Sequence, residues 1–359
     1  MLVVSITPGA SKRIMKGKTK VSNSDQQCQE RKVPLTATHE LRLLRREVAQ
    51  LQDELLTLNS KWEEQIPDPM MLHTARQAVK EKWQANQVEQ LSAQLHGELA
   101  YQQFVVATLQ SRFLQSPLFS NDQQLYSSIH EQIRLGRDPA ERAATLESSF
   151  QRTIRKLPNA LASSTRGIIP SVNPYSQTRV TGARDHTLVS SIFVAEIPHA
   201  SFQDMFDATL SYFAALPDEM ERHTGTSMHT TELQHFGDYL DYSRIRYASK
   251  AIESTGNYAT GVSVVDGIGV FFIDAIDHDE LYPNSSEESV ATACSALTIT
   301  PTTDEATGGC KMVLRRVLVA RYNLSPEAAA VQENTKLCTP IANGDLLIAT
   351  VVRFLQQQQ

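Results

Sequence analysis

The residues of this chain that could carry chemistry are few, and they match no common catalytic motif: the sequence contains no GxSxG, HExxH, GxxxxGK[ST] or GxGxxG. Acidic side chains gather after a predicted strand, at Asp274, Asp277, His278, Asp279 and Glu280. Hard cations prefer such oxygen ligands, but the spacing fits no calcium loop and a turn glycine is missing. We interpret the segment as a solvated loop.

Three histidines, His223, His229 and His235, recur every six residues. No carboxylate or cysteine completes a zinc set with them, so we expect surface or partly buried side chains. Nothing in the sequence identifies a nucleophile or a general base. The chain is therefore expected to be no enzyme and to hold no metal and no cofactor.

Cysteine usage and composition indicate the class of protein. The four cysteines are widely spaced and form no CxxC pair: Cys28, Cys294, Cys310 and Cys338. Reduced thiols in the cytoplasm or nucleus are the plain interpretation. The chain of 359 residues is 41% hydrophobic and 21% charged, which is typical of globular proteins. It has no apolar run long enough for a membrane span.

The first element that the sequence predicts along the chain is a helix with a heptad pattern. Apolar residues recur at alternating steps of three and four: Leu41, Leu44, Val48, Leu51, Leu55, Leu58 and Trp62. This pattern predicts a coiled coil over residues 35–66, ended by Pro67 and Pro69, with a possible homodimer as its product. The alternative is a single amphipathic helix that packs on its own body.

Residues 1–34 form a basic arm that we expect to be disordered, although the whole chain has a net charge of -6. Asn23, Arg31 and Leu41 keep the spacing of a basic leucine zipper. The residues between Asn23 and Arg31 include no base, however, and Pro34 interrupts the helix that must run into the zipper. Binding to nucleic acid is therefore the weaker hypothesis.

A helical region is predicted over residues 70–157, beginning with a helix over 70–114 whose second face is rich in glutamine. Shorter helices are predicted at 125–135 and 140–156. Proline and glycine are frequent after residue 157, so residues 158–186 are expected to be a linker.

From Thr187 the pattern changes to short β-rich runs. We predict a strand at 187–197, a helix at 202–216 capped by Ser201, six more strands and a terminal helix at 346–355. The six strands are expected at 228–236, 242–250, 258–265, 268–276, 290–299 and 311–322. The Asp266-Gly267 pair predicts a hairpin. The fold class is α+β, an antiparallel sheet with its helices on one side.

This element order resembles the START-like helix-grip fold, a curved sheet around a long C-terminal helix, here over residues 187–357. The whole chain also resembles an oomycete family whose members are often labelled mating-specific proteins. The resemblance is carried by the seam from Leu41 to Trp62, by Lys82-Trp83 and by the strand around Met312. It implies that the domain binds a lipid or another hydrophobic ligand.

Alternation along two strands gives candidates for the lining of such a cavity. They are Arg316, Asp274, Phe272, Met312, Leu314 and Leu318. A buried charge needs a partner, so Arg316 and Asp274 are expected to pair. By resemblance to sterol-binding START domains, this pair would meet the polar head of the ligand. The alternatives are a bulge that turns Arg316 outward, or a core on the opposite face.

Three functions follow. The first is non-enzymatic binding of a lipid in a START-like cavity, with association through the coiled coil. The second is a degenerate zipper-type DNA-binding regulator whose START-like domain is a sensor. The third is an assembly protein whose cavity is filled by side chains.

Overall fold

The computed structural model describes residues 37–113, 121–183, 185–198, 200–285, 288–303 and 309–357. The chain divides into two compact units, Met1–Ala85 and Asn86–Gln359. The basic arm, including Asn23, Arg31 and Pro34, lies outside the described residues, so disorder of the arm and binding to DNA stay predictions.

The first unit contains helix α1 (Ala37–Gln65) and the start of helix α2 (Pro69–Phe113). The break between the helices falls at the predicted prolines, and the Asp68 carboxylate caps α2 by accepting from the Met70 N–H at 2.9 Å. The seam of α1 is exposed in this single chain: its leucines and valine are 53% to 60% exposed, and Trp62 is half-buried.

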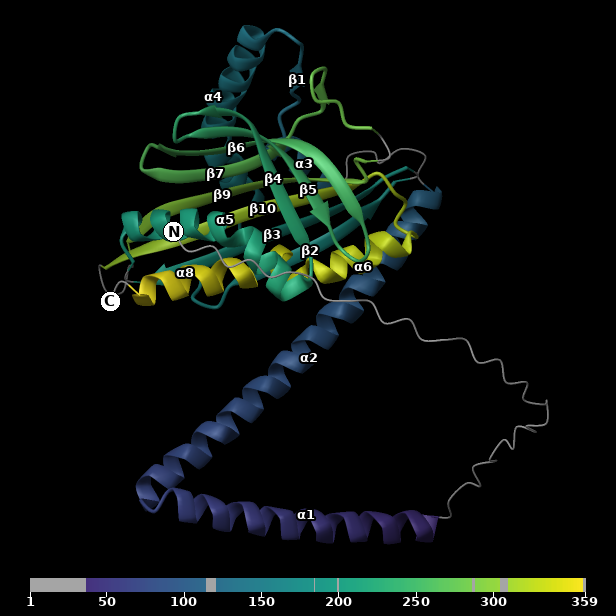
Figure 1. Ribbon diagram of the computed structural model, residues 1–359, viewed down its shortest axis with the longest axis vertical. Helices are drawn as coiled ribbons and strands as arrows, with labels where there is room; N and C mark the ends of the chain where they lie inside the picture. Colours follow the sequence, from purple (N-terminus) through teal and green to yellow (C-terminus); the bar gives the residue numbers. More distant parts are fainter. Residues whose placement is uncertain are drawn as a thin grey trace, which may run out of the picture. The chain divides into compact units, whose positions relative to one another are not determined.

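The second unit is built on an antiparallel sheet of eight strands in the order β2-β3-β10-β9-β7-β6-β5-β4, which curves visibly in Figure 1. The strands are β2 (Tyr175–Gly182), β3 (Thr187–Pro198), β4 (Ser227–Phe236), β5 (Leu240–Ala248), β6 (Glu253–Val265), β7 (Ile268–Ala275), β9 (Ala291–Thr303) and β10 (Cys310–Tyr322). The predicted hairpin joins β6 to β7, and its two turn residues, Asp266 and Gly267, have φ of 51° and 75°. Positive φ at both positions is what a tight two-residue hairpin requires.

One face of the sheet is covered by helices α3 (Asn121–Ile129) and α4 (Pro139–Ser164). Helix α4 begins where the Asp138 side chain accepts from the Glu141 N–H and Pro139 takes the first helical position. Its apolar residues, such as Leu146 and Phe150, pack with Val313, Val317 and other residues of the sheet. We call this side the α4 face.

The other face carries helices α5 (Phe202–Thr224) and α8 (Asp345–Gln357). Ser201 caps α5, and Gly225 ends it with φ of 66°. Met205 of α5 and Leu347 of α8 pack with Leu314 and Phe271 of the sheet. We call this side the α8 face; Figure 1 shows α5 and α8 on one side of the sheet and α4 on the other.

A third cluster closes one end of the unit. Phe104 and Ala107 of α2 pack with Val180 of β2, Val189 of β3 and Val331 of helix α6. Helix α6 spans Ala329–Leu337 and is followed by the short helix α7 (Thr339–Ala342). Two short strands, β1 (Arg134–Leu135) and β8 (His278–Asp279), pair in parallel outside the main sheet.

The structure confirms the α+β class, with a curved antiparallel sheet and long N-terminal helices. It corrects the prediction that the helices lie on one side, because both faces are covered. Helix α5 continues through Pro217, beyond its predicted end at residue 216. Helix α3 ends at Ile129, before the predicted residue 135. The predicted linker, residues 158–186, contains the last residues of α4 and the edge strand β2. The domain boundaries stay a prediction. Among the described helices, none is long and apolar enough to cross a membrane.

Candidate functional site

Arg316 and Asp274 are both buried, with 3% and 1% of their surface exposed, but they do not pair. Arg316 lies opposite Leu297 of β9, which in turn lies opposite Phe271 of β7. Residues opposite each other in a sheet point to the same face, and that face is the α8 face. Asp274 is three residues beyond Phe271, so it points to the α4 face. The predicted pair was therefore wrong.

On the α8 face, the Arg316 guanidinium is held by backbone carbonyls. Nη2 donates to Ile341 O at 2.5 Å and to Ala342 O at 2.7 Å, at the end of α7. The guanidinium carbon lies 5.6 Å from the centre of the Phe193 ring, and Nε has no hydrogen-bond partner. Burial lowers the pKa of this arginine, although the neighbouring Tyr212 opposes the shift.

The guanidinium of Arg316 forms no direct ion pair with any residue that the structure describes, although the charge of Asp345, the first residue of α8, opposes the lowering of its pKa. Among the described residues, no carboxylate lies within 4.0 Å of its guanidinium, whereas sixteen other ion pairs meet that limit. The carbonyls at the end of α7 supply only partial negative charge. The arginine is thus a buried cation in an apolar layer, with one donor left unused.

The α7–α8 junction brings the chain close to this arginine. Ser191 Oγ donates to Ala342 O, the carbonyl that also binds Arg316. Gly344 follows with φ of 87°, and a Cβ built at this position would collide with the ring of Phe193. A glycine is required here both by the left-handed backbone and by the contact.

On the α4 face, Asp274 binds His130, which follows α3. His130 Nδ1 donates to Asp274 Oδ1 at 2.7 Å and Nε2 donates to Asp277 Oδ1 at 3.3 Å. The Glu131 N–H donates to Asp274 Oδ2, and the Ile133 N–H donates to Asp277 Oδ2, each at 2.8 Å. Burial lowers the pKa of His130, but its bonds to the two carboxylates outweigh this and raise that pKa well above the usual range.

Cys294 of β9 completes this buried cluster. Its Sγ lies 3.8 Å from His130 Nδ1. The ligand atoms of His130, Asp274 and Cys294 all lie within 4.8 Å of one another, a grouping that could hold a metal ion. Burial, with the charge of Asp274, raises the pKa of the Cys294 thiol to about 12. The ring of Tyr126 stacks on the imidazole at 4.7 Å.

A second buried ion pair fixes the loop after β7. Arg142 of α4 donates two hydrogen bonds of 2.8 Å to Asp279, one to each carboxylate oxygen. The Tyr242 hydroxyl and the N–H groups of Leu281 and Tyr282 donate to the same carboxylate. Burial raises the pKa of Asp279, but these donors lower it to about 2.

The acidic segment was therefore wrongly interpreted as a solvated loop, since Asp274 and Asp279 are buried ion partners. Reasoning from the sequence missed their partners, because His130 and Arg142 lie 144 and 137 residues away along the chain. His223, His229 and His235 are exposed, as predicted. His235 groups with Glu232 and Asp241 at the surface.

The remaining ligand candidates divide between the two faces. Phe272 belongs to the cluster of the α4 face, and Met312 and Leu314 belong to that of the α8 face. Leu318 is half-buried and, by its spacing from Arg316, points to the α8 face. The six residues therefore do not line one cavity.

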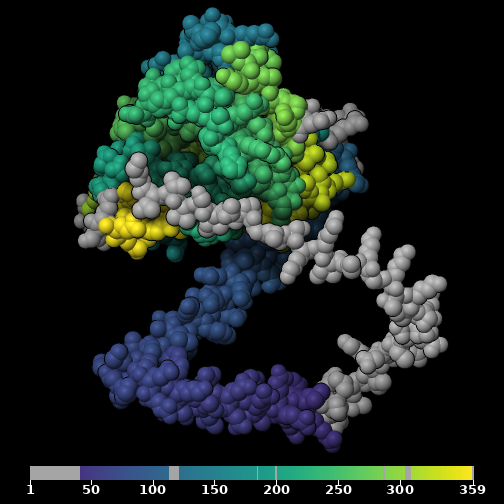
Figure 2. Space-filling view, viewed as in Figure 1, coloured from purple at the N-terminus to yellow at the C-terminus, as the bar shows by residue number. Residues whose placement is uncertain are grey.

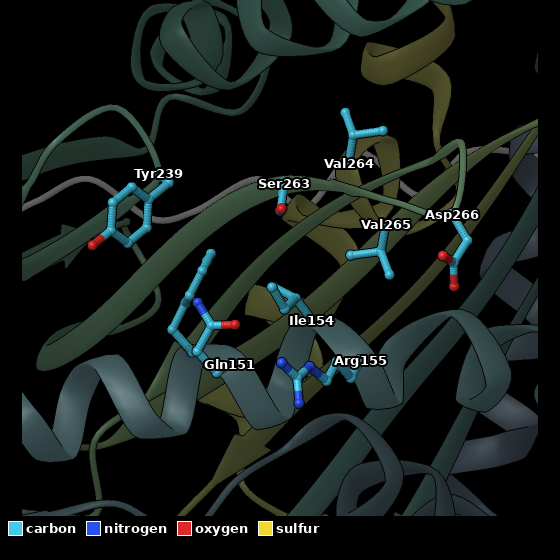
Figure 3. A pocket seen from close by; sticks show the side chains of 9 residues that line it. Gln151, Ile154, Arg155, Tyr239, Ser263, Val264, Val265 and Asp266 are labelled. Atoms are coloured by element: carbon cyan, nitrogen blue, oxygen red, sulfur yellow. The ribbon is translucent and has the colours of Figure 1, made fainter.

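The second unit has two pockets whose lining includes none of these candidates. The smaller, of about 540 Å³, opens between α4 and the β6–β7 hairpin. Figure 3 shows Arg155 and Gln151 of α4 below Val265 and Asp266 of the hairpin. The larger, of about 1430 Å³, is a groove between the Val88–Phe104 part of α2 and the segment from α6 to the start of α8.

Comparison with known proteins gives distant structural likenesses only. No protein-family model matches the chain, and no curated protein matches it. Human STARD10 aligns with 57% of this chain and 82% of its own, at 9% identity and a TM-score of 0.34. A STAR-related lipid transfer protein from Xanthomonas axonopodis covers 48% of this chain and 98% of its own, at 10% identity and a TM-score of 0.31. The human StarD13 lipid transfer and protein localization domain covers 56% of this chain and 96% of its own, at 12% sequence identity and a TM-score of 0.29.

TM-scores and identities this low carry no functional inference. The resemblance to the oomycete family likewise stays a prediction. The features that bear on function are the buried cation Arg316 on the α8 face and the buried cluster around His130 on the α4 face.

Proposed function

We propose that the second unit binds an amphipathic lipid with an anionic head group on the α8 face, without catalysis, and that Arg316 contacts the head group. The observation that carries this proposal is the buried guanidinium of Arg316, which is held by backbone carbonyls and forms no ion pair with a carboxylate of the described residues. A charge removed from water is costly unless it is paired. A carboxylate or phosphate would provide the missing charge and accept from the unused Nε.

The surroundings of Arg316 suit the apolar part of such a ligand. Along the sheet, the guanidinium is flanked by Phe193 and Leu297, and Met312 and Leu314 extend the same face. Apolar side chains of this kind favour an acyl chain over a polar solute. Phe272 and Asp274 point to the α4 face and are not part of the proposed site.

Binding requires α8 to move, because its Leu347 and Val351 are fully buried against this face. Helix α8 is the last described element, and Figure 2 shows it, in yellow, at the surface of the unit. Gly344 provides a glycine with positive φ one residue before α8. A short terminal helix after such a residue can be displaced without unfolding the sheet.

The matched probes for this proposal are oleate and oleyl alcohol, which share a chain and differ in the charged group. We expect the full chain to bind oleate about 10–100-fold more tightly than the alcohol, the range for a charge-assisted hydrogen bond. Arg316→Leu should remove that preference. The control is Arg315→Leu, which deletes the neighbouring arginine on the opposite side of β10.

Two results would contradict the proposal. One is equal binding of oleate by Arg316→Leu and the parent chain. The other is a folded parent chain that binds neither probe, with folding of each variant checked by circular dichroism. In either case Arg316 would serve only to cap the carbonyls of α7.

We also propose that the exposed seam of α1 joins two copies of the chain. Six apolar residues, each more than half exposed at heptad spacing, support this, because an isolated helix that exposes them is marginal in water. Sedimentation of the full chain should give a dimer, and Leu51→Glu should give a monomer. Leu56→Glu is the control, because Leu56 is 65% exposed but lies off the seam. A monomeric parent chain would contradict this proposal.

A further inference from the structure

We propose that His130, Asp274 and Cys294 form a zinc site on the α4 face of the sheet. This inference does not rest on the proposed lipid site, which lies on the other face. The three side chains come from the residue that follows α3, from β7 and from β9, and they meet in the interior: Asp274 and Cys294 are each 1% exposed. Nitrogen, oxygen and sulfur donors are the ligands zinc takes in proteins.

The ligand atoms are close to the arrangement that zinc requires. Zinc–ligand bonds of about 2.0–2.3 Å at tetrahedral angles separate ligand atoms by roughly 3.3–3.6 Å. His130 Nδ1 lies 2.7 Å from Asp274 Oδ1 and 3.8 Å from Cys294 Sγ. The first distance must lengthen by about 0.6 Å and the second shorten by about 0.2 Å, which side-chain rotation can supply. Water would be the fourth ligand.

Neighbouring groups hold two of these ligands in the orientation that zinc needs. Asp277 accepts from His130 Nε2, so the imidazole presents Nδ1 to the site. The Glu131 N–H donates a hydrogen bond to Asp274 Oδ2, so Oδ1 is the carboxylate oxygen that faces the site. A carboxylate behind a metal-binding histidine is the usual supporting arrangement in zinc proteins.

The presence of Cys294 favours a metal over a simple ion pair. An imidazolium between two carboxylates is already satisfied by Asp274 and Asp277. Cys294 packs in the apolar cluster of the α4 face, and its sulfur also lies 3.8 Å from Nδ1, the nitrogen that is bonded to Asp274. A zinc ion would make the sulfur a full ligand.

The binding step balances in charge and protons. Zn²⁺ forms bonds to His130 Nδ1, Asp274 Oδ1 and Cys294 Sγ. The N–H bond at Nδ1 and the S–H bond of the thiol break, and both protons go to solvent. Two positive charges arrive and two leave, so the net charge of the buried cluster does not change.

The test uses the full chain, freed of metal by a chelator and titrated with Zn²⁺ or Co²⁺ alone. We expect one ion per chain and, with Co²⁺, the near-ultraviolet charge-transfer band of a thiolate ligand. The triple variant C28A/C310A/C338A keeps Cys294 as the only cysteine and should retain the band. Cys294→Ala in that background should abolish it. Asp277→Asn should weaken binding about 10–100-fold.

Two outcomes would overturn the zinc site. One is a folded protein that retains no zinc after dialysis and shows no charge-transfer band. The other is loss of the band in the triple variant C28A/C310A/C338A, or its persistence when Cys294 alone is replaced by alanine, because either result would place the metal on another thiol. Circular dichroism of each variant without metal shows whether a loss of binding is a loss of fold.

Discussion

Arg316 of β10 and Asp274 of β7 are buried on opposite faces of the same sheet, and their hydrogen-bond partners are different. The register decides this, because Arg316 and Phe271 both lie opposite Leu297. The two charges thus belong to two separate clusters, each held by its own helices.

This separation predicts that substitutions at the two residues act independently on stability. Arg316→Leu and Asp274→Asn should each lower the free energy of unfolding, and the double variant should lose the sum of the two within about 0.5 kcal/mol. Urea unfolding of the four proteins measures this. A coupling energy well above 1 kcal/mol would show that the two side chains interact after all.

The pair of Arg142 and Asp279 predicts a large effect from a single change. Arg142→Met leaves a buried carboxylate with no cation, which should cost about 3–5 kcal/mol of unfolding free energy. Arg152→Met is a suitable control, because Arg152 lies on the same helix with an exposed ion pair to Glu131 and should change stability by about 1 kcal/mol or less. Equal losses in the two variants would show that the buried pair has no special role.

The same carboxylate predicts a dependence of stability on pH. The pKa of Asp279 is lowered to about 2 in the folded chain, and its ordinary value is 3.8. A carboxylate whose pKa is lower in the folded than in the unfolded chain stabilises the fold. The full stabilisation is present when the pH is above the unfolded-state pKa, and it is lost as the pH falls through the folded-state pKa. Between pH 4 and pH 2 the parent chain should therefore lose more stability than Asp279→Asn. Parallel slopes in urea unfolding over this range would contradict the assignment.

Much of the fold could be predicted from the sequence, because the signals were local. Alternating β-rich runs and the Asp266-Gly267 turn placed the strands that follow residue 187. The edge strand β2 was missed because its Ser, Thr, Gln and Arg residues lack an apolar alternation. The predicted end of helix α5 at residue 216 was too early, since the helix continues through Pro217 to Thr224.

The site was harder to predict, since it depends on which strands pair and in which register. Alternation along one strand showed that Arg316 shares a face with Leu314, but it could not relate that face to the face of Asp274 on another strand. That relation passes through Leu297 of β9. The partner of Asp274, His130, follows helix α3 and lies outside the predicted domain, and no local signal links the two.

Gly344 provides a test of how tightly α8 is docked. Gly344→Ala should cost about 2–4 kcal/mol, because alanine is strained at φ of 87° and its Cβ would collide with Phe193. Gly97→Ala is the matched control: it lies within α2 with open space around it, and alanine should stabilise that helix by about 0.5–1 kcal/mol. Similar thermal midpoints for the two variants would show that α8 does not depend on this contact.

The charges beside the α1 seam predict that two copies associate in parallel. With Leu41 and Leu44 at positions a and d, the g positions include Glu47 and Glu54. In a parallel pair they face the e positions Gln52 and Asn59, whereas in an antiparallel pair Glu47 would face Glu54 of the other copy. Like charges at such positions are destabilising.

Cross-linking can decide the direction of this pairing. In a Cys28→Ala background, Leu44→Cys should form a disulfide-linked dimer on mild oxidation, because equivalent d positions meet only when the helices are parallel. A mixture of the Leu44→Cys and Leu55→Cys chains is the converse test, since those two positions meet only in an antiparallel pair. If the mixture cross-links and Leu44→Cys alone does not, the parallel arrangement is wrong. If neither does, α1 does not pair with a second copy.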